Sequence, residues 1–410
     1  TRCYVVPSAP GKRDSKDTKV TDMLYQCYDA ASTGQSYKRI LDQIKKRYTD
    51  IIDGLELNLN LDFEFSKIEE NFLNKVGRDY AASRGEYLNG LIMANYLGFT
   101  FVDAADVIRF DADGNFLSEE TNEDMREHLA SLKQAVIPGF YGAKPDGTIH
   151  TFSRGGSDIT GSIVARAIQA DLYENWTDVS GFLVADPRIV DNPAPIETIT
   201  YTELRELSYM GASVLHEDAI FPVRKEGIPI NIRNTNRPED PGTMIVENTS
   251  KRPRYTITGV AGKKGFCAMN IDKAMMNSEV GFGRKVLEVF EKNGISFEHM
   301  PSGIDTMSVL VHQDEFQEKE QSVLAGIQRA VHPDIVTLES DLAVIAVVGR
   351  GMKAMRGTAA RIFAALAHAK INVKMIDQGS SELNIIIGVT DDDFEPAIRA
   401  IYDIFVKTEL

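Results

Sequence analysis

The chain reads Thr148-Ile149-His150-Thr151-Phe152-Ser153-Arg154-Gly155-Gly156-Ser157-Asp158 just before an apolar, helix-like stretch at 160–170. The alternation at its start predicts a strand, and the apolar spacing after it predicts a helix. Two glycines at such a junction let backbone N–H groups approach an anion, which a helix N-terminus also favours. Arg154 adds a planar guanidinium suited to a carboxylate or a phosphate. We therefore predict an anion site here; the alternative is a tight turn in which Ser157 or Asp158 caps the helix.

The first 250 residues mix strand-like and helical stretches. Apolar runs and alternation predict strands at 2–7, 100–103, 106–110, 135–137, 148–152, 172–177 and 228–232. Apolar residues at helical spacing predict helices at 20–32, 37–53, 84–97, 121–134, 160–170 and 201–217. This mixture predicts an α/β layer fold. The charged segment 250–254 follows a turn-rich break, and we place a domain boundary there.

The C-terminal part of the chain repeats itself. Residues 290–311 align with residues 366–387, a shift of 76 positions that places Gly303 on Gly379. Each copy reads as helix, strand, glycine turn and strand, which a preceding strand and a following helix complete as a ferredoxin-like βαββαβ unit. Two small units in tandem are typical of a regulatory module rather than a catalytic one.

The composition excludes several classes of protein. With 410 residues, 43% of them hydrophobic, the chain is long enough for two or three domains with ordinary cores. A net charge of −15 argues against a nucleic-acid partner, and no apolar run approaches the length of a membrane span. Three scattered cysteines argue against a disulfide scaffold and against a zinc site. We therefore expect a soluble, cytoplasmic protein with no metal held by the chain itself.

Two further motifs each allow two interpretations. Ser83-Arg84-Gly85-Glu86 fits a capping box with Ser83 as N-cap, although a buried glutamate at a helix start could instead hold a ligand's ammonium group. Trp176-Thr177-Asp178-Val179 ends a strand and leads to Asp186-Pro187-Arg188. Loops beyond the carboxyl ends of strands are where α/β sheets bind ligands, and the alternative is an ordinary turn.

Two other patterns imitate known sites. Asp111-Ala112-Asp113-Gly114-Asn115 has the acidic alternation of a calcium loop but lacks its glycine and glutamate at the required positions, so a hairpin turn is favoured. Gly349-Arg350-Gly351-Met352-Lys353-Ala354 fits a dinucleotide-binding fingerprint. Too few strands follow it for that fold, and the 76-residue repeat explains the segment better.

Taken together, the motifs resemble those of the aspartokinases (aspartate kinases), which have the amino-acid kinase fold. The resemblance also rests on Ser8-Ala9-Pro10-Gly11 and on Met210-Gly211-Ala212-Ser213-Val214-Leu215-His216, in matching order along essentially the whole chain. It implies an α/β catalytic domain at 1–250, with an open, mostly parallel sheet and helices on both faces. Two ferredoxin-like βαββαβ ACT units would follow.

The resemblance further implies that the ACT units interleave. The first ACT unit, 273–338, would be inserted into the second ACT unit. The second ACT unit would comprise 251–272 and 339–410, and the strand near 266–271 would belong to it.

The resemblance implies transfer of the ATP γ-phosphoryl group to the β-carboxylate of L-aspartate, with Mg²⁺ bridging the phosphates. Arg154 would clamp the carboxylates of aspartate and Glu86 would hold its ammonium. The implied substrate and catalytic positions are Arg154, Glu86, Thr21, Asp158, Ser157, Gly155 and Gly156. The implied nucleotide positions are Thr177, Asp178, Leu183, Asp186, Arg188 and Ser213. Because a carboxylate is already ionised at neutral pH, this chemistry needs positioning and charge neutralisation rather than a general base.

The sequence departs from the family pattern in three places. The family's opening Lys-Phe-Gly-Gly-Ser/Thr does not occur in it, and Thr1 runs at once into a strand-like stretch, so we expect that motif on an upstream strand. Ser213 stands where the family has a nucleotide-side lysine. Leu183 stands where an aromatic residue often lies near the adenine.

In the family, lysine or threonine binds the ACT units and inhibits the enzyme. The implied effector contacts are Met276, Ser296, Phe297, Glu298 and Ser302. Glu298 would pair with the effector's ammonium; for each of these residues, the alternative is an ordinary strand or turn position. We expect lysine first and threonine second, and a homodimer or homotetramer formed through the ACT units.

Two other functions remain open on the sequence alone. Another carboxylate or phosphate kinase of the same fold, such as a glutamate kinase, is disfavoured by the tandem repeat. A non-catalytic amino-acid sensor would be favoured if the phosphate-neutralising lysine were truly absent.

Overall fold

The computed structural model describes residues 2–153, 155–212, 217–251, 253–353 and 355–408. The chain divides into two compact units, which we call the first unit (1–176 with 215–231) and the second unit (177–214 with 232–410). This division separates residues 177–214 from the rest of the expected 1–250 domain, and the boundary at 250–254 stays a prediction. Residues 177–214 bind the C-terminal part directly; for example, Val260 N donates to Val184 O at 2.7 Å.

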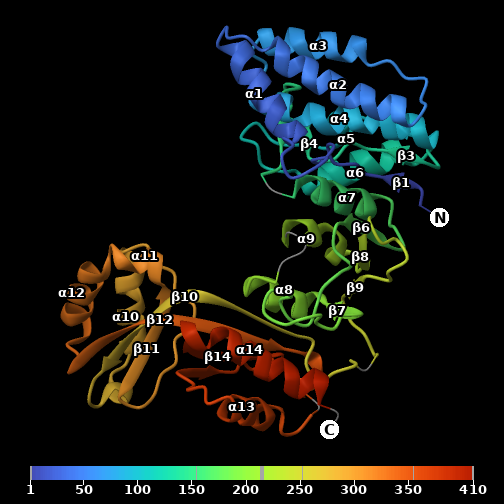
Figure 1. The fold of residues 1–410 in the computed structure, drawn as a ribbon. Coiled ribbons are helices and arrows are strands. Elements are labelled where there is room, and N and C mark those ends of the chain that lie inside the picture. Colours follow the sequence, from blue (N-terminus) through green and yellow to red (C-terminus); the bar gives the residue numbers. More distant parts are fainter. Residues whose placement is uncertain (1, 154, 213–216, 252, 354, 409–410) are drawn as a thin grey trace. The chain divides into compact units, whose positions relative to one another are not determined.

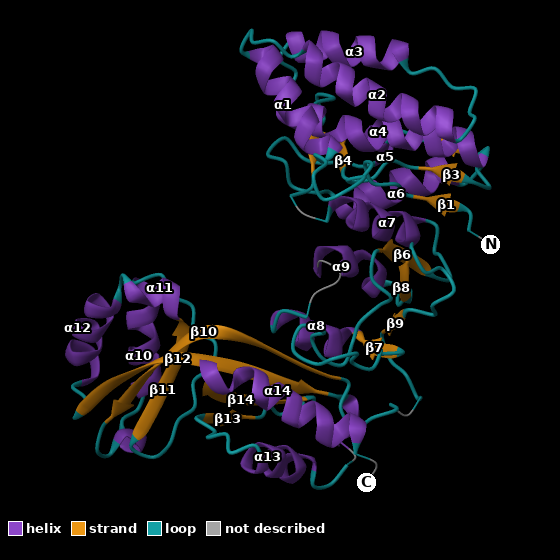
Figure 2. Cartoon of the chain, viewed as in Figure 1, coloured by secondary structure: helices purple, strands orange, loops and turns teal. Residues whose placement is uncertain are grey.

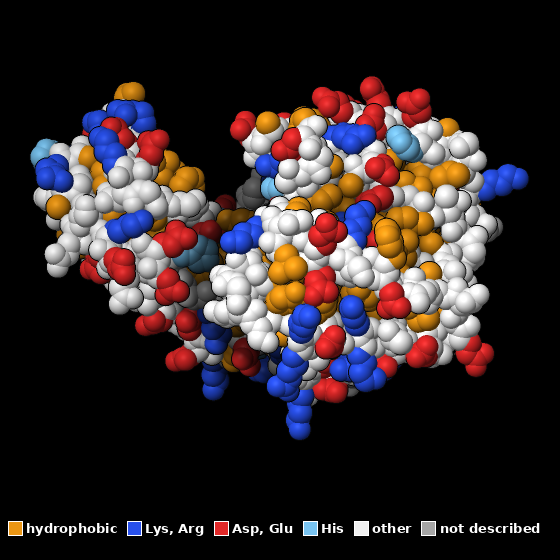
Figure 3. Space-filling view, turned by 90° about the horizontal axis from the view of Figure 1, so that it is seen from above, with side chains coloured by type: hydrophobic (Ala, Val, Ile, Leu, Met, Phe, Trp, Pro, Cys, Tyr) orange, Lys and Arg blue, Asp and Glu red, His pale blue; other side chains and the backbone are white. Residues whose placement is uncertain are grey.

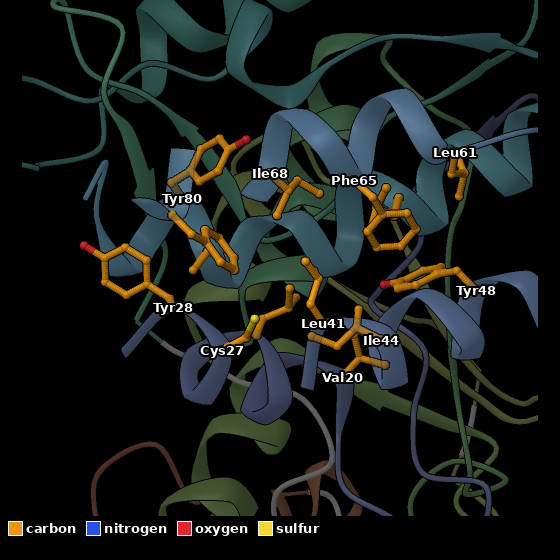
Figure 4. Packing of buried hydrophobic residues seen from close by; sticks show 14 of the residues in the cluster. Val20, Cys27, Tyr28, Leu41, Ile44, Tyr48, Leu61, Phe65, Ile68 and Tyr80 are labelled. Atoms are coloured by element: carbon orange, nitrogen blue, oxygen red, sulfur yellow. The ribbon is translucent and has the colours of Figure 1, made fainter. Parts of the chain in front are cut away.

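The first unit begins with a layer of helices. Buried residues on its first helix recur every three or four positions, so one face enters the core together with side chains of the next three helices (Figure 4). The sequence patterns miss the third of these helices. The four are α1 (Val20–Ser32), α2 (Lys38–Gly54), α3 (Asp62–Leu73) and α4 (Arg78–Leu97).

A small parallel sheet lies against α4, in the order β1 (Tyr4–Val5), β3 (Ala135–Val136) and β2 (Thr100–Phe101). Figure 1 shows α4 on one side of it and α7 on the other. The segment at 106–110, which we expected to be a strand, instead overlaps a helical turn, because Asp103 accepts a hydrogen bond from Ala105 N and caps it. The remaining elements are α5 (Ala104–Val107), α6 (Ser118–Leu129), β4 (Tyr141–Ala143), β5 (Ile149–Thr151), α7 (Gly156–Ala167) and α9 (Glu217–Lys225).

A second sheet has the strand order β6 (Tyr173–Thr177), β8 (Ile230–Asn234), β9 (Thr243–Val246) and β7 (Thr198–Thr200). Its β7 and β9 are parallel, and α8 (Tyr201–Tyr209) follows β7. The predicted α/β class, with parallel strands and covering helices, is confirmed. Among the described residues, no helix is both long and apolar enough to cross a membrane. On the face shown in Figure 3, basic side chains are interspersed with acidic ones.

The C-terminal sheet is antiparallel and is built from the two repeated segments (Figure 2). Its strand order is β11 (Thr306–His312), β10 (Gly259–Asp272), β12 (Ile335–Val348), β14 (Asn384–Thr390) and β13 (Met375–Asp377). We call the half with β11 the first copy, and the half with β13 and β14 the second copy. The helices of the first copy are α10 (Phe282–Lys292), α11 (Gln313–Gln317) and α12 (Glu320–Val331); those of the second are α13 (Thr358–His368) and α14 (Phe394–Tyr402). Short turns of 3-10 or π-helix are η1 (Met276–Ser278), η2 (Arg350–Lys353), η3 (Asp391–Asp393) and η4 (Asp403–Lys407).

The strand pairing changes one expected boundary between the copies. Residues 266–272 of β10 pair with β11 as well as with β12, whereas residues 259–264 pair with β12 alone. The stretch 266–272 therefore lies in the first copy, not in the second. A 14-residue strand can serve both copies because its register shifts near Gly265, which has a φ of +88°.

The glycines of the dinucleotide-like stretch have a structural purpose. A Cβ on Gly349 would lie 2.7 Å from Ile257 Cα, and one on Gly351 would lie 2.5 Å from Thr256 O. These glycines allow the backbone around η2 to lie directly against the segment that precedes β10. Close backbone packing accounts for both glycines of this stretch.

A buried carboxylate ties α8 to the C-terminal sheet. Glu203 has no exposed surface; its Oε1 accepts hydrogen bonds from Thr258 Oγ1 at 2.6 Å and Arg350 N at 2.8 Å. Its Oε2 accepts from Arg350 Nη1 at 2.9 Å and from Thr200 N at 2.9 Å, the latter within the capping box that begins α8. Burial raises the pKa of Glu203, but the hydrogen bonds outweigh it and leave the pKa below its ordinary value. The ionised carboxylate therefore stabilises the fold at neutral pH, and this contribution is lost as the pH falls below the ordinary glutamate range.

We predict that Glu203→Gln lowers the free energy of unfolding by about 3–5 kcal/mol, because it leaves the Arg350 guanidinium buried beside a neutral partner. Denaturant titration followed by circular dichroism measures the change. Glu315→Gln, at an exposed position of α11, is the control and should shift the value by less than about 0.5 kcal/mol. Equal values for the two variants would show that the buried pair contributes nothing.

Candidate active site

The carboxylate of Glu86 is the most unusual buried group of the first unit. Glu86 lies near the middle of α4 and is 6% exposed. Its Oε1 accepts a hydrogen bond from Ala9 N at 3.1 Å, whereas its buried Oε2 has no partner among the described residues. A buried acceptor without a donor costs free energy, so a ligand that brings an N–H group here is stabilised.

Burial also changes the protonation of this group. Loss of solvent raises the pKa of Glu86 to about 7, against the opposing effects of the hydrogen bond from Ala9 N and the charge of Arg84. The carboxyl group therefore changes its charge near neutral pH, and a cationic ligand would favour the ionised form.

Close packing at Gly85 sets the position of this carboxylate. A Cβ on Gly85 would lie 2.8 Å from Ala9 Cβ and 3.4 Å from Leu24 Cδ1 of α1. The glycine thus lets the loop after β1 and the start of α1 lie against α4. Thr21, a predicted substrate contact, is half-buried in the first turn of α1 on this side of the helix layer.

The motif around Glu86 does not begin its helix. Helix α4 begins at Arg78, after Gly77, so the expected capping box at Ser83 is wrong. Ser83 is fully buried inside the helix, and its Oγ accepts hydrogen bonds from Arg84 Nε at 3.1 Å and from Arg84 Nη2 at 2.9 Å. The local pattern fits a cap, but burial of the whole segment against the loop after β1 extends the helix past it.

Three tyrosine rings surround the buried guanidinium of Arg84. The Arg84 Cζ lies 4.4 Å from the ring centre of Tyr87, 4.5 Å from that of Tyr80 and 5.3 Å from that of Tyr141. Cation–π contacts of this kind stabilise a cation where no water reaches it. They hold a positive charge two residues from Glu86.

A second group of close contacts joins the loop after β3 to the start of α7. A Cβ on Gly139 would lie 2.5 Å from Ser157 Oγ, and one on Gly156 would lie 2.5 Å from Phe140 Cδ2. Gly139 N donates to Pro7 O at 3.2 Å, which links this loop to the loop after β1. The N-terminus of α7, the loop after β3 and the loop that contacts Glu86 are therefore neighbours. Such a backbone-lined helix N-terminus suits an anion.

Asp158 is oriented by the neighbouring strand. Its Oδ1 accepts a hydrogen bond from Asn175 Nδ2 at 2.8 Å, and its backbone oxygen accepts one from Tyr173 OH at 3.1 Å. Gly155, with a φ of +59°, precedes the helix, so its glycine conformation permits the turn. The predicted carboxylate clamp, Arg154, lies outside the described residues.

The sequence patterns missed two parts of this site: the tyrosines around Arg84 and the loop Gly139-Phe140. The glycine directly after the strand at 135–137 was a signal for the loop. No local signal marks the tyrosines, because Tyr80 and Tyr141 lie 61 positions apart and meet only in the fold.

The predicted nucleotide positions lie in the second unit. Arg188 is 88% exposed, and its Nη2 lies 2.6 Å from Asp186 Oδ2. Thr177 Oγ1 lies 3.3 Å from Asp178 Oδ1, and Leu183 is half-buried. Ser213 lies outside the described residues.

Comparison with known proteins shows the family of the chain. Residues 18–234 match the Amino acid kinase family, and residues 345–405 match an ACT domain. Aspartokinase 3 of Bacillus subtilis is 39% identical over an alignment that covers 98% of this chain and 92% of that protein. The chain belongs to the aspartokinases of the amino acid kinase family.

Solved aspartokinase structures share the fold. The aspartate kinase of Clostridium acetobutylicum, described as an allosteric enzyme, is 50% identical and has a TM-score of 0.88, covering 98% of this chain and 93% of that one. Aspartokinase III of E. coli, solved in complex with aspartate and ADP, is 21% identical and has a TM-score of 0.68, covering 98% of this chain and 92% of that one; it shows the common fold.

In this aspartokinase, the predicted effector residues differ in accessibility. Met276 is 5% exposed and belongs to the core of the first copy, whereas Phe297 is 44% exposed, and Ser296 and Ser302 are exposed. Glu298 is not a free carboxylate: Tyr209 OH donates to its Oε2 at 2.6 Å, and His312 Nε2 lies 3.2 Å from its Oε1.

We predict that Glu86→Gln stabilises the protein more at pH 8 than at pH 5. A raised pKa means that folding disfavours the ionised form, so the wild type loses stability as the pH rises from about 4.5 to about 7. Each unit of pKa corresponds to about 1.4 kcal/mol, and denaturant titration at the two pH values measures the difference. The exposed Glu120→Gln serves as the control. A difference between Glu86→Gln and the wild type that is independent of pH would contradict the raised pKa.

Proposed function

We propose that this chain is an aspartate kinase that transfers the γ-phosphoryl group of ATP to the β-carboxylate of L-aspartate, giving 4-phospho-L-aspartate. One observation carries the substrate assignment: in the described residues the buried Oε2 of Glu86 has no donor, and the loop that binds Glu86 also contacts the loop packed on the start of α7. An amino acid would present its ammonium to Glu86 and a carboxylate to the start of α7.

The chemistry follows from this placement. The β-carboxylate is ionised at neutral pH and attacks phosphorus without losing a proton, so the site must orient it and offset the charge of the phosphates. Glu86 holds the substrate ammonium, Thr21 borders it, and Arg154 clamps the carboxylates. Gly155 and Gly156 at the start of α7 let backbone N–H groups meet the transferring phosphoryl group.

ATP is the phosphoryl donor, and we assign the nucleotide to Thr177, Asp178, Leu183, Arg188 and the segment of Ser213. In the described residues, no cluster of three or more His, Cys, Asp or Glu side chains is placed to hold a metal ion. We propose that Mg²⁺ accompanies ATP and bridges its phosphates. Asp186 already forms an ion pair with Arg188. The nucleotide therefore displaces the Asp186 carboxylate when it binds the Arg188 guanidinium.

We further propose that the two copies of the C-terminal sheet are ACT units that bind an amino-acid effector. Lysine is the first choice, because Glu298 offers a carboxylate to a second ammonium, and threonine is the second. The same units would join copies of the chain into a homodimer or homotetramer. The cytoplasm, which supplies ATP, is the proposed compartment.

The first test separates the two substrates. Arg154→Ala is expected to raise the KM for aspartate more than tenfold, because loss of one partner of a charge-assisted pair costs roughly 2–5 kcal/mol, and to change the KM for ATP far less. Arg188→Ala is the matched variant: it should raise the KM for ATP and change the KM for aspartate far less. Both are measured by aspartate-dependent ADP release in the complete gene product. Unchanged aspartate kinetics in Arg154→Ala would remove that residue from the site, and no aspartate-dependent turnover in the wild type would refute the proposed reaction.

The second test concerns control. Activity is measured against lysine, threonine and ornithine at fixed ionic strength, so that charge effects on this acidic protein are constant. We expect lysine to inhibit and Glu298→Gln to weaken the inhibition about tenfold or more, because the ammonium loses its carboxylate. Inhibition that is unchanged in Glu298→Gln would place the effector elsewhere.

A further inference from the structure

Besides the buried Leu207, which packs on Gly259 of β10, α8 contacts the C-terminal sheet through three hydrogen-bonding side chains. They occupy positions three residues apart, Glu203, Glu206 and Tyr209, a spacing that keeps them on the same side of a helix. Glu203 binds Arg350 and Thr258, as described above. Asn384 Nδ2 of β14 donates to Glu206 Oε2 at 2.6 Å. Tyr209 OH donates to Glu298 Oε2 at 2.6 Å, and this is the contact of α8 with the first copy.

The three contacts differ sharply in burial. Glu203 is completely buried, whereas Tyr209 is 52% exposed at the last residue of α8. The beginning of α8 is therefore fixed, and its end is held by a contact that solvent reaches. A hydrogen bond at such a place opens at a lower cost than the buried network does.

Glu298 is held on the other side of this contact. Its backbone N donates to Leu310 O at 2.8 Å, and its side chain is 11% exposed. Its carboxylate lies between Tyr209 and His312, whose ring lies against Phe266 at 4.6 Å between ring centres. Its Oε2 thus accepts from a neutral phenol, and the His312 ring lies beside its Oε1.

We propose that Tyr209 is a positioning residue whose hydrogen bond to Glu298 holds the end of α8, and that an amino-acid effector releases it by taking Glu298 with its ammonium group. The inference rests on the effector site proposed above. It adds that the effector must displace the Tyr209 hydroxyl from Glu298, and that this displacement releases the end of α8.

The competition has a clear direction. An ammonium donates charge-assisted hydrogen bonds to a carboxylate, which are stronger than the bond from a neutral phenol. Burial and the charge of Glu298 raise the pKa of Tyr209 to about 12, so the phenol stays protonated and remains a donor at neutral pH. An effector at Glu298 therefore replaces a weaker partner with a stronger one.

The chain beyond α8 connects this contact to the nucleotide side. After Tyr209 it passes through Gly211, which has a φ of +95°, and reaches the predicted nucleotide position Ser213 only four residues later. Release of Tyr209 frees the end of the helix that carries this segment. The effector then acts on ATP, and not on aspartate, whose proposed contacts lie in the first unit.

Tyr209→Phe removes the hydroxyl and keeps the ring, so it gives two opposite and measurable changes. The effector, tested as lysine, no longer competes with the phenol, and its half-inhibiting concentration falls about three- to tenfold, in keeping with one partly exposed hydrogen bond to a charged group. Without lysine the KM for ATP rises, because the end of α8 is released. The KM for aspartate stays at the wild-type value.

Two control variants separate this role from a general loss of packing. Asn384→Ala removes the neighbouring contact of α8 at Glu206 but leaves Glu298 with its phenol, so the half-inhibiting concentration of lysine should not fall. Tyr96→Phe, an exposed tyrosine of α4 in the first unit, should change neither value. The inference is overturned if Tyr209→Phe leaves both the lysine response and the KM for ATP at wild-type values, or if Asn384→Ala lowers the half-inhibiting concentration equally.

Amide hydrogen exchange tests the contact independently of activity and inhibition. If the wild type does not respond to lysine, the proposed effector site fails, but Tyr209→Phe must still accelerate exchange at residues 207–212 relative to Tyr96→Phe. Exchange at the same rate in both variants would show that the hydroxyl does not hold the end of α8.

Discussion

The fully buried carboxylate of Glu203 organises the second unit. It brings together the start of α8, the segment before β10 and the turn after β12, which are separated by up to about 150 positions in the sequence. A buried charge is tolerated only where hydrogen bonds and an opposite charge replace water, so each of these segments must be in place for the others to be stable. This requirement explains why residues 177–214 pack closely with the C-terminal sheet.

Two buried glutamates differ in how completely their oxygens are hydrogen-bonded. Glu203 has donors on both oxygens and a pKa below its ordinary value, whereas Glu86 has a donor on one oxygen and a pKa raised to about 7. The difference is one of satisfied hydrogen bonds, since both side chains are almost without exposed surface. The complete set at Glu203 stabilises the fold. At Glu86, Oε2 has no donor within the part of the chain that the structure describes, so a ligand that supplied one would recover free energy.

Glycines act here mainly by allowing backbone segments to touch. Gly85 lets the loop after β1 lie against α4, and Gly139 and Gly156 let the loop after β3 lie against α7. Gly349, after β12, lets the segment before β10 lie against the backbone there. At each of these positions a Cβ would lie closer than 3.0 Å to a neighbouring atom. The proposed anion site of the first unit would therefore be built from backbone as much as from side chains, which suits a substrate whose reacting groups are carboxylate and phosphate.

The sequence alone determined the α/β class, the helix at 20–32, the 76-residue repeat and the family, because periodic burial and motif order are local or regularly spaced signals. It did not determine that Ser83 lies inside a helix, that residues 266–272 belong to the first copy, or that Glu298 already has a partner. Those facts depend on contacts such as Ala9 with Glu86 and Tyr209 with Glu298, whose residues are 77 and 89 positions apart. A local pattern records which face of an element is apolar. Only the tertiary structure decides which polar atoms then meet, because each buried donor and acceptor must find its partner wherever the folded chain places it.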